Sequence, residues 1–217
     1  WWFEWWENKV VFTGNYITGK PDGDITYYDR NSNEIGRYTI KDGTGMSLTF
    51  HANKKPSSRQ RLYKGIEDGI YQELTPRGRV VVEGNYRGGA KHGAWKEWLA
   101  DGTLLLEQNW KRGKLDGSVK KYVDGKVAME TTYVDGKVEG PFVETRNGKP
   151  AVTGQFAADL RTGTWTHYDT DGVVILAANY KAGVLDGSWR QLVGGVVLEG
   201  QMASGRRTGT WTRTDKA

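Results

Sequence analysis

Glycine returns at a near-constant interval along this chain of 217 residues. The interval is 22–24 residues, and the positions are Gly23, Gly45, Gly69, Gly93, Gly117, Gly140, Gly163, Gly187 and Gly209. A unit of this length cannot bury a hydrophobic core alone, so successive units must stack against one another. The period therefore predicts a single repeat domain over residues 1–217, with about nine repeats.

Each repeat glycine begins a short aromatic strand, of which residues 93–98, Gly-Ala-Trp-Lys-Glu-Trp, are a clear example. A pair of turn-forming residues then follows, and such pairs tolerate the positive φ of two-residue hairpin turns. These pairs are Asp101-Gly102, Asp124-Gly125, Asn147-Gly148, Asp171-Gly172 and Gly194-Gly195. The residues after each turn alternate in hydropathy, as in a returning strand. The sequence thus predicts an antiparallel β-hairpin in each repeat.

The returning strands end in an aromatic or apolar residue in every repeat, which predicts a ladder of core side chains. The ladder consists of Tyr16, Tyr38, Leu62, Tyr86, Trp110, Tyr133, Phe156, Tyr180 and Met202. Three residues later a glycine is usual, with Lys41 and Asp159 as the exceptions, so the chain turns there into the next repeat. The predicted fold class is all-β, an elongated single-layer array of antiparallel β-hairpins.

Composition and motifs give no sign of catalysis. The chain has no cysteine, so disulfides and cysteine-based zinc sites are excluded. Its three histidines, His51, His92 and His167, lack the spacing of metal ligands. No serine lies in a nucleophile elbow, and no phosphate-binding glycine loop precedes a helix. We therefore predict no enzyme, no catalytic residues, no metal and no cofactor.

The net charge of +5 comes from 31 basic and 26 acidic residues that are interspersed through every repeat. No nucleic-acid-binding motif accompanies the charge, so we predict a solvated surface and no nucleic-acid partner. No apolar run reaches the ~18–20 residues of a membrane-spanning helix. Residue 1 is Trp rather than Met, which indicates that an upstream segment has been removed. The localisation is left open between bacterial cytoplasm and periplasm.

A second aromatic column gives the first candidate binding site. Trp95 and Trp98 are three positions apart, so in an unbulged strand they point to opposite faces of the sheet. If one face buries the core ladder, the other carries an exposed aromatic ridge suited to a protein or a glycan. The ridge candidates are Trp98, Tyr122 and Tyr168. The competing interpretation is that a bulge or coiling of the sheet buries this column too.

The irregular repeat at residues 41–69 gives the second candidate site, a basic patch. Its residues are Lys54, Lys55, Arg59, Arg61 and Lys64. Such a patch is suited to the head groups of anionic lipids. The alternative is a solvated, mobile hairpin tip.

A column of acidic residues lies on the outer face of the returning strands: Glu83, Glu107, Glu130 and Glu199. Thr153 and Ala177 interrupt it. Cations on the neighbouring strands, Lys96, Lys120 and Arg190, are predicted to pair with these carboxylates across the sheet. Catalysis by paired carboxylates would need a concave pocket, which a single-layer sheet rarely supplies.

The first residues, Trp1-Trp2-Phe3-Glu4-Trp5-Trp6, continue the repeat in phase. Trp2 and Trp5 fall in the columns of Trp95 and Trp98. We therefore predict a first strand whose surplus aromatic side chains cover the end of the sheet or pack on missing upstream residues. A dedicated ligand site is the alternative.

The combined pattern resembles the bacterial variant of the MORN repeat. Its most telling stretches are residues 111–117, Lys-Arg-Gly-Lys-Leu-Asp-Gly, and 181–187, Lys-Ala-Gly-Val-Leu-Asp-Gly. Residues 41–69 depart most, with Ser47 in place of the usual Trp and Asn53-Lys54 at the turn. The resemblance implies an elongated array of hairpins. For function it implies protein–protein contact, lipid binding, or an antitoxin or immunity-like role.

The sequence leads to two functional hypotheses. The first is a non-enzymatic scaffold that binds a partner protein, with an immunity or antitoxin role as its sharpest form. The alternative is a cell-envelope module that binds an anionic lipid or polysaccharide. Open sheet ends also favour a homodimer that pairs through its edge strands.

Overall fold

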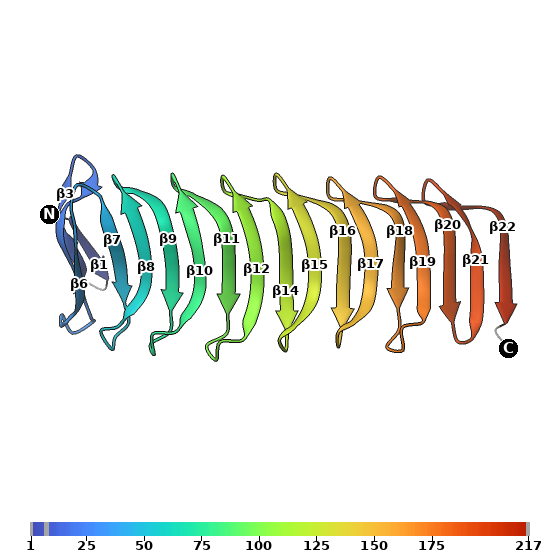
Figure 1. Cartoon of the computed structure of the whole chain (residues 1–217), viewed down its shortest axis with the longest axis horizontal. Coiled ribbons are helices and arrows are strands. Elements are labelled where there is room, and N and C mark those ends of the chain that lie inside the picture. The colour runs from blue at the N-terminus through green and yellow to red at the C-terminus, as the bar shows by residue number, and fades with distance from the viewer. Residues whose placement is uncertain (1, 7–8, 216–217) are drawn as a thin grey trace. The chain divides into compact units, whose positions relative to one another are not determined.

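The computed structural model describes residues 2–6 and 9–215, with side chains from residue 11 on. All regular elements in this described part are β-strands (Figure 1). The chain divides into two compact units, Trp1–Lys114 and Leu115–Ala217. In each unit successive strands pair as antiparallel hairpins, so the predicted all-β hairpin array is confirmed. A single domain over the whole chain stays a prediction.

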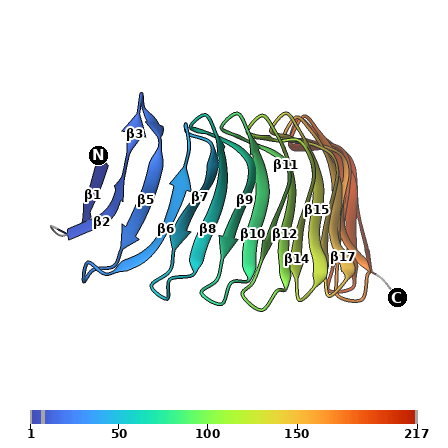
Figure 2. The same cartoon turned by 60° about the vertical axis from the view of Figure 1, so that its left-hand side comes forward.

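The first unit holds a four-stranded sheet and a longer meander. The four-stranded sheet has the order β1-β2-β5-β6, and the small hairpin β3-β4 extends from it (Figure 2). The meander runs in chain order from β7 to β12. Strand bounds are β1 Trp2–Trp6, β2 Lys9–Gly14, β3 Tyr16–Ile17, β4 Lys20–Pro21, β5 Gly23–Tyr28, β6 Glu34–Ile40, β7 Gly45–Phe50, β8 Pro56–Tyr63, β9 Ile66–Leu74, β10 Val80–Arg87, β11 Ala90–Trp98 and β12 Leu104–Lys111.

The second unit is a single meander that runs in chain order from β14 to β22 (Figure 1). The short strand β13, Lys114–Leu115, spans the division between the units in sequence. The bounds are β14 Gly117–Val123, β15 Lys126–Val134, β16 Lys137–Arg146, β17 Lys149–Ala157, β18 Leu160–Tyr168, β19 Val174–Lys181, β20 Val184–Val193, β21 Val196–Ala203 and β22 Arg206–Asp215.

The predicted first strand is present as β1, which pairs with β2. Trp1 lies outside the described residues, as do the side chains of Trp2 and Trp5. The prediction that these rings cover the sheet end therefore stays a prediction.

The turns that join one repeat to the next, here called linking turns, are themselves tight hairpin turns. Arg112 and Gly113 both have positive φ, 52° and 80°, as a two-residue turn requires. The linking turns also bond to the hairpin before them: the Gly183 N–H donates to the carbonyl of Arg161, near the start of the strand that follows the previous turn, at 2.9 Å. A carboxylate reinforces several of these contacts, as when Asp186 accepts from the Ser204 N–H at 3.2 Å. The linking turns thus form a regular hydrogen-bonded ladder in each unit.

The turns at the opposite edge, here called tip turns, differ from the prediction in two repeats. Asp124-Gly125, Asn147-Gly148 and Gly194-Gly195 form two-residue turns, as predicted. Asp101-Gly102 and Asp171-Gly172 instead lie within five-residue loops, residues 99–103 and 169–173.

Local hydrogen bonds explain the longer loops. The Asp101 carboxylate accepts the backbone N–H of Thr103 at 2.8 Å, and Asp169 accepts those of Asp171 and Val173 at 2.9 and 2.8 Å. The bond from Thr103 holds the pKa of Asp101 below its usual value. An aspartate that bonds to its own loop in this way favours an Asx-type turn over a two-residue hairpin.

From Gly45 onward, the structure of each tip explains the length of its repeat. Repeats of 24 residues combine a five-residue loop with a one-residue register shift, as between Glu97 and Trp98. Repeats of 23 residues keep the shift but have a two-residue turn. The 22-residue repeat that begins at Gly187 has the short turn and no register shift between β20 and β21.

Several of the most deeply buried side chains lie in the column two residues after the repeat glycine. Trp95 and Trp165 are 3% and 2% exposed. The predicted ladder lies beside them but is only half-buried, and its member Tyr16 is 44% exposed, so the predicted position of the core is corrected. Both tryptophans are more buried than the ladder residues because each lies against a glycine of the preceding returning strand. Gly84 lies under Trp95, and Gly154 lies under Trp165.

Hydrogen bonds and ring contacts fix these tryptophans in place. The indole Nε1 of Trp95 donates to the Asn85 carbonyl at 3.2 Å, and that of Trp165 donates to the Gln155 carbonyl at 3.1 Å. The Tyr71 ring stacks on Trp95 with centroids 5.7 Å apart. Burial, together with a hydrogen bond to Glu73, raises the pKa of Tyr71.

Each buried residue of this column lies opposite a residue of the preceding returning strand, as Trp95 lies opposite Gly84. When one member of such a pair is larger, the other is smaller. Where the returning strand carries the larger Thr131, the opposite position is Phe142 rather than Trp. In the irregular repeat the Trp position is Ser47, and the ring of Phe50 fills the space over Gly36 instead. The Ser47 hydroxyl lies 3.1 Å from the hydroxyl of Tyr38. The irregular repeat is therefore a packed variant of the same plan.

Candidate binding surface

The acidic column carries ion pairs, as the sequence predicted. The Lys96 Nζ lies 2.8 Å from Glu107, and the Lys120 Nζ lies 3.1 Å from Glu130. Arg190 and Glu199 are 3.6 Å apart. Glu83 instead accepts a hydrogen bond from the Gln72 amide at 2.7 Å. Cross-strand pairing with a cation is confirmed for Glu107, Glu130 and Glu199, and Glu83 pairs with an amide instead.

The ridge candidates Trp98, Tyr122 and Tyr168 are all half-buried. Trp98 belongs to the first unit and the two tyrosines to the second. Each follows a register shift in its hairpin.

The position of Tyr168 agrees with the predicted opposite faces. Its hydroxyl lies 3.5 Å from Thr153 Oγ1. Thr153 pairs with Thr166, the neighbour of Trp165 in β18, so its side chain lies on the face opposite Trp165. The role of the ridge in binding stays a prediction.

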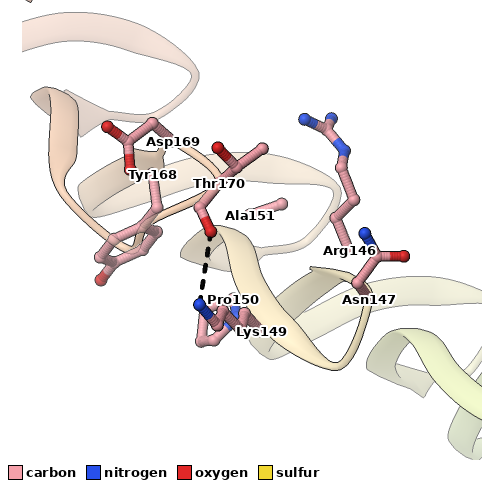
Figure 3. Close-up of a pocket in the computed structure, with 8 residues that line it drawn as sticks. All are labelled: Arg146, Asn147, Lys149, Pro150, Ala151, Tyr168, Asp169 and Thr170. Atoms are coloured by element: carbon pink, nitrogen blue, oxygen red, sulfur yellow. Dashed lines mark hydrogen bonds between the residues drawn. The ribbon is translucent and has the colours of Figure 1, made fainter.

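Tyr168 lines a shallow cavity of about 160 Å³ at the tip edge of the second unit (Figure 3). Arg146 and Lys149 flank the tip turn of the neighbouring hairpin and line the same cavity. The Lys149 Nζ donates to the Thr170 carbonyl at 3.5 Å, the contact dashed in Figure 3. A second cavity of about 280 Å³ adjoins it through Arg146 and is also lined by Lys126. The tip edge therefore combines an aromatic ring with three cations.

Sequence reasoning missed Arg146 and Lys149. The available signal was their position on either side of the Asn147-Gly148 turn. A two-residue turn projects its flanking side chains at the sheet edge. Tyr168 belongs to the next hairpin, so its proximity to them follows from the pairing of β17 with β18.

The five residues of the predicted basic patch are exposed, but they are spread along one strand. Lys54 and Lys55 lie at the tip edge, whereas Lys64 lies in a linking turn. The eight-residue strand β8 separates these ends by about 26 Å. Arg59 and Arg61 lie within that strand. The five cations do not meet as one cluster.

A different row of cations gathers at the linking turns of the first unit. Consecutive turns are about 10 Å apart because two strands separate them. The described residues show no ion pair for any of these exposed cations, and exposed Tyr63 and Ile66 lie among them. We call this set the linking-turn row: Lys41, Lys64, Arg87, Lys111 and Arg112.

The histidines and acidic residues that the structure describes do not gather as metal ligands. Within the part of the chain that the structure describes, no three of these side chains form such a group. His51 Nε2 lies 2.7 Å from the Leu74 carbonyl, which gives this histidine a structural contact between neighbouring tips. The described residues also contain no helix suited to crossing a bilayer.

Comparison with protein families finds a similar repeat in two segments of the chain. A family model described as MORN repeat variant matches residues 91–112 and 161–182. Two repeats of the chain therefore match this family model. Each matched segment begins with a cation stacked on the buried tryptophan: Lys91 lies 4.1 Å from the Trp95 ring centroid and Arg161 lies 4.4 Å from that of Trp165. No curated protein matches the chain. MORN repeats are a non-enzymatic repeat type, found in scaffolds that bind proteins or lipids.

Proposed function

We propose that this MORN-variant chain is a scaffold that binds a partner protein through the tip edge of its second unit. The observation that carries the proposal is the cavity where Tyr168 lies with Arg146 and Lys149. Tyrosine and arginine are enriched in the energetically dominant positions of protein interfaces. A half-buried ring is already held in one orientation, so binding it costs little conformational entropy.

Trp98 and Tyr122 extend the proposal as further contact residues, each within its own unit. A broad, rigid surface of this kind would suffice for an immunity or antitoxin role, which remains the sharpest form of the proposal. Partner binding of this type needs no catalytic group. Three carboxylates of the acidic column are held in ion pairs, which suits a structural role for them.

The test is to capture the partner from a lysate of the source organism, identify it by mass spectrometry, and measure its affinity for variants. Tyr168→Ala and Arg146→Ala are each expected to weaken binding at least tenfold, because truncation at an interface centre costs about 2 kcal/mol. Tyr63→Ala is the matched control, since Tyr63 is an exposed tyrosine in the first unit. Unchanged affinity in both tip-edge variants would show that the partner binds elsewhere.

The linking-turn row favours a second candidate function, binding to an anionic lipid surface. Exposed Tyr63 and Ile66 flank Lys64 of this row, and such side chains are suited to a membrane interface. Attraction to an anionic leaflet contributes about 1 kcal/mol for each basic residue near the surface.

Co-sedimentation with phosphatidylcholine vesicles, with and without phosphatidylserine, tests this candidate. The double change Lys41→Glu/Arg112→Glu is expected to reduce binding to the anionic vesicles at least tenfold, and added salt should weaken binding by the parent chain. The control, Lys54→Glu/Lys55→Glu, makes the same charge change at the tip edge. Equal loss in both variants would indicate an effect of net charge alone, and absence of vesicle binding would remove the candidate.

A further inference from the structure

One cation of the second unit lacks a carboxylate that the repeat pattern provides elsewhere. In the first unit, Lys96 pairs in register with Glu83 on one side and Glu107 on the other. The equivalent cation of β20 is Arg190, which pairs in register with Glu199 on one side and Ala177 on the other. The alanine therefore leaves an opening beside the guanidinium.

Arg190 has unused hydrogen-bonding capacity. Its Nε lies 3.6 Å from the Glu199 carboxylate, and its side chain is 42% exposed. Within the described part of the chain, this guanidinium donates no hydrogen bond. A guanidinium has five N–H donors in a planar fork that matches a carboxylate. Arg190 can thus donate hydrogen bonds to a second carboxylate while it remains beside Glu199.

The opening is a shallow hollow of about 440 Å³ on the face of the sheet. Ala177 lies in it together with hydroxyl and amide side chains: Ser188, Gln201, Thr210 and Thr212. The Ser188 Oγ accepts a hydrogen bond from the Asn179 amide at 2.5 Å, which leaves its own O–H to donate. We call this site, with Arg190 and Glu199, the Arg190 hollow.

We propose that the Arg190 hollow binds a carboxylate from an acidic side chain of the partner protein. The incoming carboxylate would occupy the place that Ala177 leaves vacant in the acidic column and so restore the acid–cation–acid register of Glu83, Lys96 and Glu107. Hydroxyl donors around the hollow suit its second oxygen. The adjacent negative charge of Glu199 disfavours a dianionic phosphate more than a single carboxylate. This inference rests on the proposed protein-binding function.

The test uses poly-L-glutamate as the probe and the full chain labelled with ¹⁵N. Titration is expected to shift the amide resonances of residues around Arg190 and Ser188. Arg190→Gln should reduce the affinity about tenfold, because a charge-assisted pair is lost. Ala177→Glu should cause a similar loss for the opposite reason: it supplies the missing carboxylate from within the chain and leaves Arg190 in place.

Arg213→Gln is the control, since it removes one exposed positive charge from neighbouring β22 outside the hollow. It should change the affinity less than twofold. Parent-like binding by Ala177→Glu would overturn the inference, as would equal losses in all three variants. Binding of alginate, a polyuronate, without binding of polyglutamate would also overturn it and assign the hollow to acidic glycans. Because this readout does not use the partner or Tyr168, its failure leaves the tip-edge proposal standing.

Discussion

Replacing Trp165 with alanine is expected to lower the free energy of unfolding of the second unit by about 3–5 kcal/mol. The indole is 2% exposed and contacts the rings of Phe142, Phe156 and Tyr180, with centroids 5.4, 4.9 and 6.5 Å away. Its removal leaves a cavity on a single-layer sheet and also removes the ring on which Arg161 stacks. Urea unfolding followed by circular dichroism measures the effect.

Val193→Ala is the control for that substitution, because Val193 is 61% exposed and its truncation should change stability by less than about 0.5 kcal/mol. A loss below about 1 kcal/mol in Trp165→Ala would mean that the aromatic contacts around it contribute little.

The second large effect is expected from the opposite change, Gly154→Thr. A Cβ atom at this position would lie 2.3 Å from Cδ2 of the Trp165 ring, so the ring must be displaced from its buried site. The expected loss is about 3 kcal/mol, at the upper end for overpacking. The same urea experiment measures it, and Ala157→Thr, an exposed position on the same strand, is the matched control.

A double variant separates this steric effect from loss of β-strand stability. Gly154→Thr/Trp165→Phe reproduces the Thr131 and Phe142 pair that the chain already uses two strands away. It should be more stable than Gly154→Thr alone by about 1–2 kcal/mol, a favourable coupling between contacting residues. If the double variant is the less stable of the two, volume exchange does not govern this pair.

The period of the repeat and its alternating strands were sufficient to predict the hairpins and their antiparallel order. They were not sufficient to locate the core. Tyr86 and Trp95 both have the correct hydropathy, and only the register between β10 and β11 places Trp95 over Gly84. That register contains an irregularity between Glu83 and Asn85, which depends on pairing between repeats and has no local sequence signal.

The tip turns show the same limit on a smaller scale. Asp101-Gly102 and Asp124-Gly125 are identical dipeptides, yet one lies in a five-residue loop and the other forms a two-residue turn. The number of residues between the flanking strands decides the outcome, together with the bond from Thr103 to Asp101.

For the candidate site, the ridge position of Tyr168 was predictable from strand alternation. Its cationic neighbours were not, because Arg146 belongs to another hairpin. The predicted basic patch failed as a cluster because its residues are close in sequence but far apart in the structure. Lys54 and Lys64 are near in sequence, but an extended strand carries them to opposite edges. Proximity in sequence is a poor guide to proximity in space when the intervening residues form a strand.

From Gly45 onward, repeats of 22, 23 and 24 residues coexist because the variation in length falls on the tip side of the hairpin. The linking turns stay two residues long and keep their hydrogen bonds to the strand that follows the previous turn, such as those from Gly183 to Arg161 and from Gly205 to Leu185. A repeat can therefore gain or lose a residue without shifting the phase of its neighbours. The edge formed by the linking turns therefore keeps the spacing of the repeats constant in each unit. The tip edge can vary in length and sequence, so a new binding surface can arise there without a change in how the repeats pair.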